Sequence, residues 1–259
     1  MFSTRELSAA VEAVRDEHAP GALVLDCAHD FETVPPAQAE ELGLLVDSLD
    51  PASYPAEWLP ADAPEVLVTY ASSDLTVGMP GDGGVAWTRQ TEPPVVLCKP
   101  RLDGSPDSFV DFLIAEALVE VGLDEPEHML GFFGAEYPNF ADAVRPSLDP
   151  VGTYQLAVAC YDAYLGLQTR EIFAEWDGPL FEAWLDAGDR LSGRVEELPT
   201  AIATGELSVP EAAELACNAI KHAGELPAPF DALDASAYLD HGASYAVEWA
   251  ERVAETISG

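Results

Sequence analysis

Residues 95–122 read "VVLCKPRLDGSPDSFVDFLIAEALVEVG", and they separate two kinds of sequence in this chain. The first four residues form a short apolar run typical of a strand, which is entered through the proline pair before it. The turn-forming letters "DGSPDS" follow, and residues 107–121 then have the apolar spacing of a helix. Before this stretch we predict both strands and helices, and after it only helices.

The N-terminal part, residues 1–105, is expected to be a small mixed α/β part. Ser3 and Glu6 have the spacing of a capping box and predict the start of a first helix. The letters "GALVLDC" predict a buried strand. "LTVGM" and "VAWTR" flank "PGDGG" (80–84), which predicts a β-hairpin because glycine and aspartate tolerate the backbone angles of a tight turn.

The C-terminal part, residues 106–259, is expected to be all-helical, which makes the fold class α+β. Met129, Phe132 and Phe133 belong to an aromatic-rich segment that we expect in the core, with the wall of a pocket as the alternative. The joint between the two parts is short, so we expect a single integrated domain over residues 1–259. The helices are predicted at residues 107–121, 126–136, 153–175, 179–203, 209–223 and 234–256.

The net charge of the chain is −36, from 47 acidic and 11 basic residues. Such a charge repels itself in dilute buffer, whereas in about 1 M salt the Debye length falls to roughly 3 Å and the repulsion is screened. The acids are spread along the chain, while an acidic mimic of nucleic acid or a partner of basic proteins would gather them in blocks. The composition therefore predicts a soluble, halophilic, cytoplasmic protein with salt cations at its acidic surface.

Several kinds of partner are disfavoured by the same composition. No basic stripe is present that could neutralise phosphates, which argues against nucleic acid and against anionic membranes. The N-terminal sequence lacks the basic flank and apolar run of a signal peptide, and no run approaches the ~20 apolar residues of a membrane span. The four cysteines are far apart, so we expect reduced, buried thiols.

The helix "FLIAEALVEVG" (112–122) shares half of a metal-binding pattern. Glu116 and Gly122 coincide with the glutamate and glycine of H-E-x-x-H-x-x-G, but Ala115 and Val119 stand at its two histidine positions. The order of strand, loop and helix resembles that of zincin metallopeptidases. One interpretation is therefore a degenerate zincin-like scaffold that has lost its metal ligands. The other is an ordinary helix with Glu116 on its solvent side.

The basic residues Arg89, Lys99 and Arg101 lie within 13 positions of one another in a chain with few cations. Arginine binds carboxylates through two parallel hydrogen bonds, so the cluster suits an anion-binding site or a docking patch. Ion pairs within the protein are the alternative. Together with Glu116, these three residues are the ones to which we assign a binding role.

No catalytic pattern is complete in this sequence. It contains no nucleophile elbow, no phosphate-binding loop and no spaced set of metal ligands, so we expect no catalytic residue, metal or cofactor. The leading interpretation is a non-catalytic binding or interaction module for a protein or small-molecule partner, with its cleft between the hairpin strand and the helix at 107–121. The alternative is a metallopeptidase-like hydrolase that uses Glu116 or Asp162 as acid/base.

Several segments also point to one family over most of the chain. The chain is similar there to a haloarchaeal family of uncharacterised proteins, defined as a domain of unknown function. The resemblance implies an archaeal, salt-adapted protein and implies no activity. It rests on "MFSTRELSAAVEAVRDEHAPGALVLD" (1–26), "VGMPGDGGVAWTRQTEPPVVLCKP" (77–100), "FVDFLIAEALVEVGL" (109–123), "PEHMLGFFGAEY" (126–137) and "ELACNAIKH" (214–222).

Overall fold

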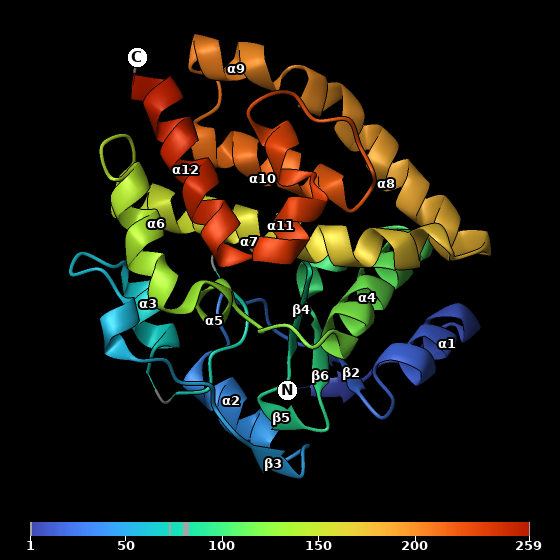
Figure 1. Ribbon diagram of the computed structural model, residues 1–259. Helices are drawn as coiled ribbons and strands as arrows, with labels where there is room; N and C mark the ends of the chain where they lie inside the picture. The colour runs from blue at the N-terminus through green and yellow to red at the C-terminus, as the bar shows by residue number, and fades with distance from the viewer. Residues whose placement is uncertain (1, 73, 80–82, 259) are drawn as a thin grey trace. The chain divides into compact units, whose positions relative to one another are not determined.

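The computed structural model describes residues 2–72, 74–79 and 83–258. It confirms the α+β class, because within the described residues the strands end at Cys98 and only helices follow (Figure 1). The expected boundary near residue 105 falls inside the first of two compact units, and the single integrated domain stays a prediction. Unit 1 comprises Met1–Tyr54, Val68–Glu127 and Asp177–Ala183, and unit 2 comprises Pro55–Leu67, His128–Trp176 and Trp184–Gly259.

Unit 1 is built on a four-stranded mixed sheet with the order β1-β2-β6-β4. The two central strands, β2 and β6, are parallel, with Leu25 opposite Leu97, and the outer strands run antiparallel to them. The predicted strands at β2 and β6 are confirmed. The strands of this sheet are β1 (Phe2–Thr4), β2 (Leu23–Cys27), β4 (Val85–Thr88) and β6 (Val95–Cys98), and a separate ribbon pairs β3 (Ser48–Leu49) with β5 (Thr91–Glu92).

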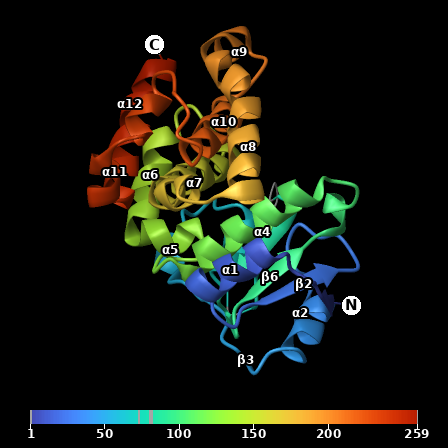
Figure 2. The ribbon, with the colours of Figure 1, turned by 90° about the vertical axis from the view of Figure 1, so that its right-hand side faces the viewer.

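Helices cover both faces of this sheet. Helices α1 (Ala9–His18) and α4 (Asp107–Gly122) pack against each other, and α4 also packs against β4 and β6 (Figures 1 and 2). On the other face, α2 (Pro36–Gly43) and two loop segments close an apolar core. The fully or largely buried members of that core are Leu25, Cys27, Phe31, Val34, Leu42, Val77, Ala86, Val95 and Leu97.

The first helix begins later than the sequence predicts. Ser3 lies in β1 and pairs with Asp26, while the helix starts at Ala9 with Ser8 as its N-cap. The Ser8 hydroxyl accepts a hydrogen bond from the backbone N–H of Val11. The capping box at Ser3 was therefore wrong, because pairing with β2 gives residues 2–4 ladder hydrogen bonds that a helix start cannot match.

The predicted hairpin is also displaced. Residues 75–79 form no strand: the carbonyl of Val77 accepts a hydrogen bond from the backbone N–H of Val34, and that of Gly78 accepts one from the Tyr70 hydroxyl. The expected turn residues 80–82 lie outside the described residues. Strand β4 pairs instead with β6, the next long strand along the chain, so the antiparallel pair exists one element later than predicted.

Helix α4 is buried on nearly all sides, contrary to the interpretation that places Glu116 on a solvent-facing side. Glu116 is only 7% exposed, and Ala115 and Val119 are fully buried. A helix that is apolar around its circumference is a core helix, and Phe112 helps to complete that circumference. Gly122 lies against helix α1: a Cβ at this position would come within 2.3 Å of the His18 carbonyl oxygen.

Unit 2 is helical and centres on the long helix α7 (Pro150–Ala174), along which α10 (Val209–Ile220) packs. The predicted helix at 179–203 is two helices, and that at 234–256 breaks at Gly242, which adopts a positive φ of 52°. The remaining helical elements of the chain are η1 (Ala56–Trp58), α3 (Glu65–Tyr70), η2 (Pro100–Leu102), α5 (Met129–Phe133), η3 (Gly134–Glu136), α6 (Tyr137–Val144), α8 (Gly178–Glu196), α9 (Leu198–Thr204), η4 (Phe230–Leu233), α11 (Ser236–His241) and α12 (Ala243–Ser258).

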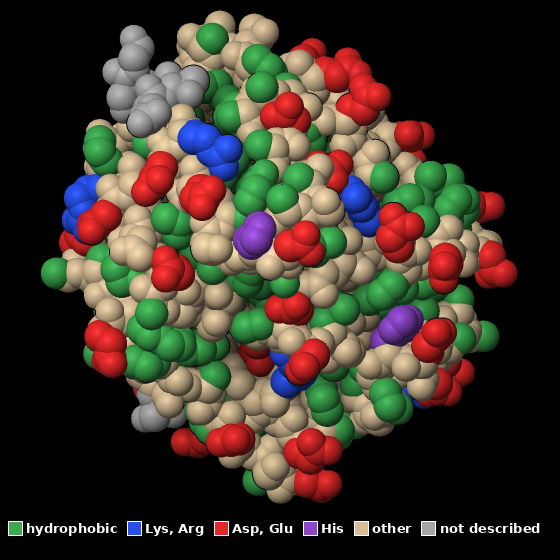
Figure 3. Space-filling view, viewed as in Figure 1, with side chains coloured by type: hydrophobic (Ala, Val, Ile, Leu, Met, Phe, Trp, Pro, Cys, Tyr) green, Lys and Arg blue, Asp and Glu red, His purple; other side chains and the backbone are tan. Residues whose placement is uncertain are grey.

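The surface reflects the acidic composition. Acidic side chains are scattered over the face in Figure 3, with few lysines and arginines among them. In the part of the chain that the structure describes, no helix has the length and apolar character needed to cross a bilayer.

Candidate functional site

Arg89 makes its contacts within unit 1. Its guanidinium donates a hydrogen bond of 2.6 Å to the carbonyl of Leu123 and another to the carbonyl of Glu125, and it lies 5.7 Å from the centre of the Trp87 ring. Arg89 therefore ties the end of β4 to the segment that follows α4.

Lys99 and Arg101 lie at the opposite end of the β4–β6 pair from Arg89. Lys99 is 1% exposed, and its ammonium lies 4.8 Å from the ring centre of Phe31. Arg101 forms ion pairs with Asp30 at 2.8 Å and Glu32 at 3.0 Å. Its hydrogen bonds lower the pKa of Asp30. Segment 30–32 thus brings two of the three predicted cations together, and the third lies elsewhere in unit 1.

The two candidate acids of the hydrolase alternative belong to different units. Glu116 lies on α4 in unit 1, and Asp162 is half-buried on α7 in unit 2. Among the described residues, no group of three or more His, Cys, Asp or Glu side chains is arranged to hold a metal ion. The hydrolase alternative stays a prediction, as does the binding role of Glu116 and the basic cluster.

The carboxylate of the half-buried Glu127, which the sequence did not single out, joins two segments of unit 1. One oxygen of Glu127 accepts hydrogen bonds from the Thr88 hydroxyl (3.0 Å) and the Arg89 backbone N–H (2.9 Å). The other accepts one from the side-chain amide of Gln90 (2.8 Å). Burial raises the pKa of Glu127, although these donors act in the opposite direction. No pattern around "EPEH" marks this role, since its partners lie almost 40 residues earlier.

The four cysteines are buried and free, as the sequence predicts. Burial raises the pKa of both Cys27 and Cys98 to about 12. Burial also raises the pKa of the other two thiols, Cys160 and Cys217. Thiols in this state are poor nucleophiles at neutral pH.

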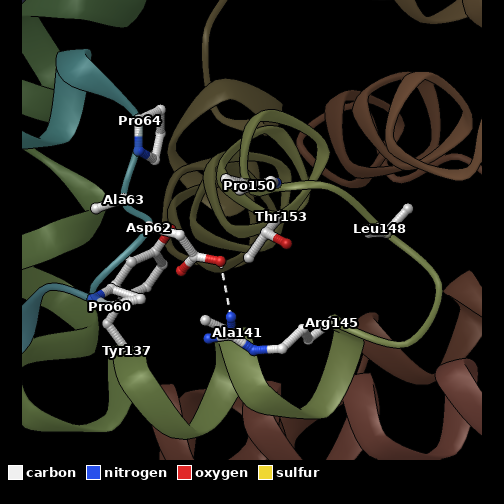
Figure 4. A pocket seen from close by; sticks show the side chains of 10 residues that line it. All are labelled: Pro60, Asp62, Ala63, Pro64, Tyr137, Ala141, Arg145, Leu148, Pro150 and Thr153. Carbon is white, nitrogen blue, oxygen red and sulfur yellow. Dashed lines mark hydrogen bonds and ion pairs between the residues drawn. The ribbon is translucent and has the colours of Figure 1, made fainter.

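Unit 2 contains a small open pocket with polar groups on its walls (Figure 4). It occupies about 290 Å³ when the solvent at its open mouth is included. Three segments form it: the loop before α3, helix α6 with the residues after it, and the first turn of α7. The lining residues are Pro60, Asp62, Ala63, Pro64, Tyr137, Ala141, Arg145, Leu148, Pro150 and Thr153.

An ion pair crosses the wall of this pocket. Arg145 donates to Asp62 at 2.7 Å through one terminal nitrogen, and both side chains are 49% exposed. Its other terminal nitrogen and its Nε donate to Asp142, at 3.1 and 3.3 Å. Asp142 therefore holds one edge of the guanidinium, and the edge bearing the Asp62 contact faces the pocket (Figure 4).

Two hydroxyl groups line the pocket without a partner in the described part of the chain. Tyr137 is 1% exposed and Thr153 is 5% exposed. Neither hydroxyl forms a hydrogen bond with a described residue. Burial, and then the charge of Asp62, raise the pKa of Tyr137, so its phenol stays protonated and can donate. Because both groups open into the pocket, a bound molecule can reach them.

The N-terminus of α7 does not itself supply free donors to the pocket. Asp149 is the N-cap, and its carboxylate accepts a hydrogen bond of 2.7 Å from the Gly152 backbone N–H. The polar groups available to a ligand are therefore side chains: the two hydroxyls and the Asp62–Arg145 pair. Apolar wall residues, mostly proline and alanine, surround them.

Only an indirect sign of this pocket is present in the sequence. The segment 125–140 was expected in the core, with a pocket wall as the alternative, and the structure shows both uses. Met129, Phe133 and Phe140 are almost fully buried and Phe132 is only half-buried, while Tyr137 at the start of α6 lines the pocket. Nothing in the spacing linked these residues to the loop at 60–64.

Comparison with known proteins identifies the family and nothing beyond it. No curated protein and no solved structure matches the chain. A family model, described as a family of unknown function (DUF7089), matches residues 1–257. The chain therefore belongs to DUF7089, a family of unknown function.

Proposed function

We propose that the protein is a non-catalytic binding module and that the pocket of unit 2 holds its small-molecule ligand. The observation that carries the proposal is that two largely buried residues, Tyr137 and Thr153, line one pocket with hydroxyls that have no partner among the described residues. Neither hydroxyl oxygen is fully buried, so each can exchange hydrogen bonds with water or with a bound molecule. A ligand that accepts hydrogen bonds can therefore use both groups without breaking a bond within the protein.

Free energies of unfolding distinguish hydroxyls that are available to a ligand from hydroxyls that stabilise the fold. Thr169 and Tyr238 serve as matched controls, because both are buried and both hydroxyls donate to a backbone carbonyl, at 3.0 and 2.7 Å. Thr169→Val and Tyr238→Phe should each lower the free energy of unfolding by about 1 kcal/mol. Thr153→Val should leave it unchanged or raise it, because no hydrogen bond within the protein is lost.

Binding itself can be tested with a panel of small probes. Propionate, propionamide, methylammonium and glycerol would be titrated into the isotope-labelled full chain in molar KCl, and backbone amide shifts followed by NMR. At least one probe should shift the amides of Ala141 and Thr153, and Thr153→Val should weaken that response while Thr169→Val leaves it intact. If no probe shifts any amide of the pocket lining, the proposal is refuted.

The proposed setting of this module follows from the charge. A net charge of −36 is tolerated where salt screens it, so we place the protein in the salt-rich cytoplasm of an archaeal cell, with cations at its surface. Measured stability as a function of salt concentration tests this part independently of any ligand.

A further inference from the structure

In this pocket the carboxylate of Asp62 forms an ion pair with Arg145. Asp62 reaches Arg145 from the loop between η1 and α3, and Figure 4 shows the carboxylate directed at the guanidinium. This contact is the one hydrogen bond or ion pair of the Asp62 side chain within the described residues. The cation of the pocket, Arg145, is thus already paired with the carboxylate of Asp62, which has no other such contact with a described residue.

That contact is weak enough to be exchanged. Both partners are half-exposed, and exposed ion pairs contribute about 0–1 kcal/mol to stability. The loop that carries Asp62 has its own support, because the backbone N–H of Ala63 bonds to the carbonyl of Pro60. Asp62 can therefore leave Arg145 without the loop losing its turn.

An incoming carboxylate can make contacts that Asp62 does not make. Asp62 forms no hydrogen bond with Tyr137 or Thr153, although all three side chains line the same pocket. A carboxylate has two oxygens and accepts several hydrogen bonds, so a free one on Arg145 has acceptor capacity left for a hydroxyl of the lining. The surplus of contacts favours the ligand over the internal group.

The walls around the polar groups are apolar. Pro60, Pro64, Leu148 and Pro150 offer apolar contact, which suits a short apolar chain attached to the carboxylate. On the basis of the proposed function, we propose that the ligand carries a carboxylate on a short apolar chain and that Asp62 is an internal competitor which the ligand displaces from Arg145.

The proposal is tested with propionate and its neutral isostere propionamide, titrated into the full chain in molar KCl and followed by amide shifts. Propionate should bind more tightly than propionamide. Arg145→Gln should weaken propionate binding roughly 10- to 100-fold, as expected for lost charged hydrogen bonds. Asp62→Asn should tighten it, by up to about fivefold, because the competing pair is removed.

A second arginine of unit 2 provides the matched control. Arg190 is exposed and paired with Asp186 at 2.7 Å, and it does not line the pocket. Arg190→Gln removes the same charge and should leave propionate affinity unchanged. Tyr137→Phe and Thr153→Val should each weaken binding roughly 2- to 10-fold.

The possible outcomes separate this inference from the proposed function. If propionamide or methylammonium shifts the pocket amides and propionate does not, the carboxylate class is refuted while the binding module stands. If propionate binds and Asp62→Asn weakens it, Asp62 helps the ligand and the competition is refuted. If Arg190→Gln weakens binding as much as Arg145→Gln, the attraction is a general charge effect and the site is refuted. If no probe binds, both proposals fail.

Discussion

Replacing Glu127 by glutamine removes a negative charge from a buried hydrogen-bond cluster while keeping the shape of the side chain. The carboxylate accepts from the Thr88 hydroxyl, the Arg89 backbone and the Gln90 amide. A glutamine has one oxygen and one NH₂ group, so in either orientation an NH₂ faces an N–H donor, on Gln90 or on Arg89. One donor then lacks an acceptor, which costs about 1–3 kcal/mol of unfolding free energy.

The larger substitution Glu127→Ala removes both acceptor oxygens and all three hydrogen bonds. Its cost should exceed that of glutamine and reach at least about 3 kcal/mol, since three donors lose their partner. Such a loss is a large fraction of the ~5–15 kcal/mol that stabilises a typical domain. The measurement is urea unfolding in molar KCl, followed by tryptophan fluorescence.

The effect of Glu127→Gln should also depend on pH. Burial raises the pKa of Glu127 above its ordinary value of 4.5, so the folded protein holds this proton more tightly than the unfolded chain. The contribution of the group to stability is then full below 4.5 and is lost as pH rises through the folded pKa. Glutamine does not titrate, so the stability difference between wild type and variant should shrink as pH rises.

Asp124→Asn controls for the loss of charge as such, because Asp124 is exposed in the same segment. It removes one negative charge from a strongly acidic chain and should be neutral or slightly stabilising. If Glu127→Gln is as stable as Asp124→Asn at every pH, the reasoning about the cluster is refuted.

Three further predictions concern packing, thiols and salt. Gly122→Ala should cost about 1–3 kcal/mol in urea unfolding, because its Cβ would meet the His18 carbonyl, whereas Gly193→Ala in α8 has open space and should be neutral or stabilising. Equal effects would contradict that close approach. Cys27 and Cys98, whose pKa burial raises to about 12, should not react with Ellman's reagent in the native protein at neutral pH, while all four thiols should react in urea. Rapid native reaction would show that these sites open. Lowering KCl from about 1 M to 0.1 M lengthens the Debye length from roughly 3 to 10 Å, so the acidic side chains repel one another more strongly. The midpoint of thermal unfolding should therefore fall. An unchanged midpoint would contradict the interpretation of the chain as adapted to salt.

Helix α4 illustrates what a pattern can and cannot assign. Glu116 and Gly122 matched half of a zincin helix in the sequence. In the structure Gly122 lies where the backbone of α1 approaches, and the two histidine positions of the pattern hold fully buried side chains. The helix itself was predictable from its apolar spacing, but which of its sides is covered depends on everything packed around it.

Much of the fold followed from local signals. The strands β2 and β6, the helices α4, α7 and α10, and the change to an all-helical second part were predicted because each has its own apolar period or turn residues. Errors arose where distant pairing competed with a local signal. Ser3 became part of β1 because β2 offered it a partner, and residues 75–79 bonded to the loop at Val34 instead of forming a hairpin.

By itself, the sequence determined the α+β class, the free buried thiols and the acidic surface, because composition and short-range periodicity suffice for these. Only the tertiary structure decided which groups meet. The pocket joins the loop at 60–64 with Tyr137, Arg145 and Thr153, and the Glu127 cluster joins segments almost 40 residues apart. Neither set has a spacing to recognise, since contacts between distant segments are set by how helices and loops pack and not by their order along the chain.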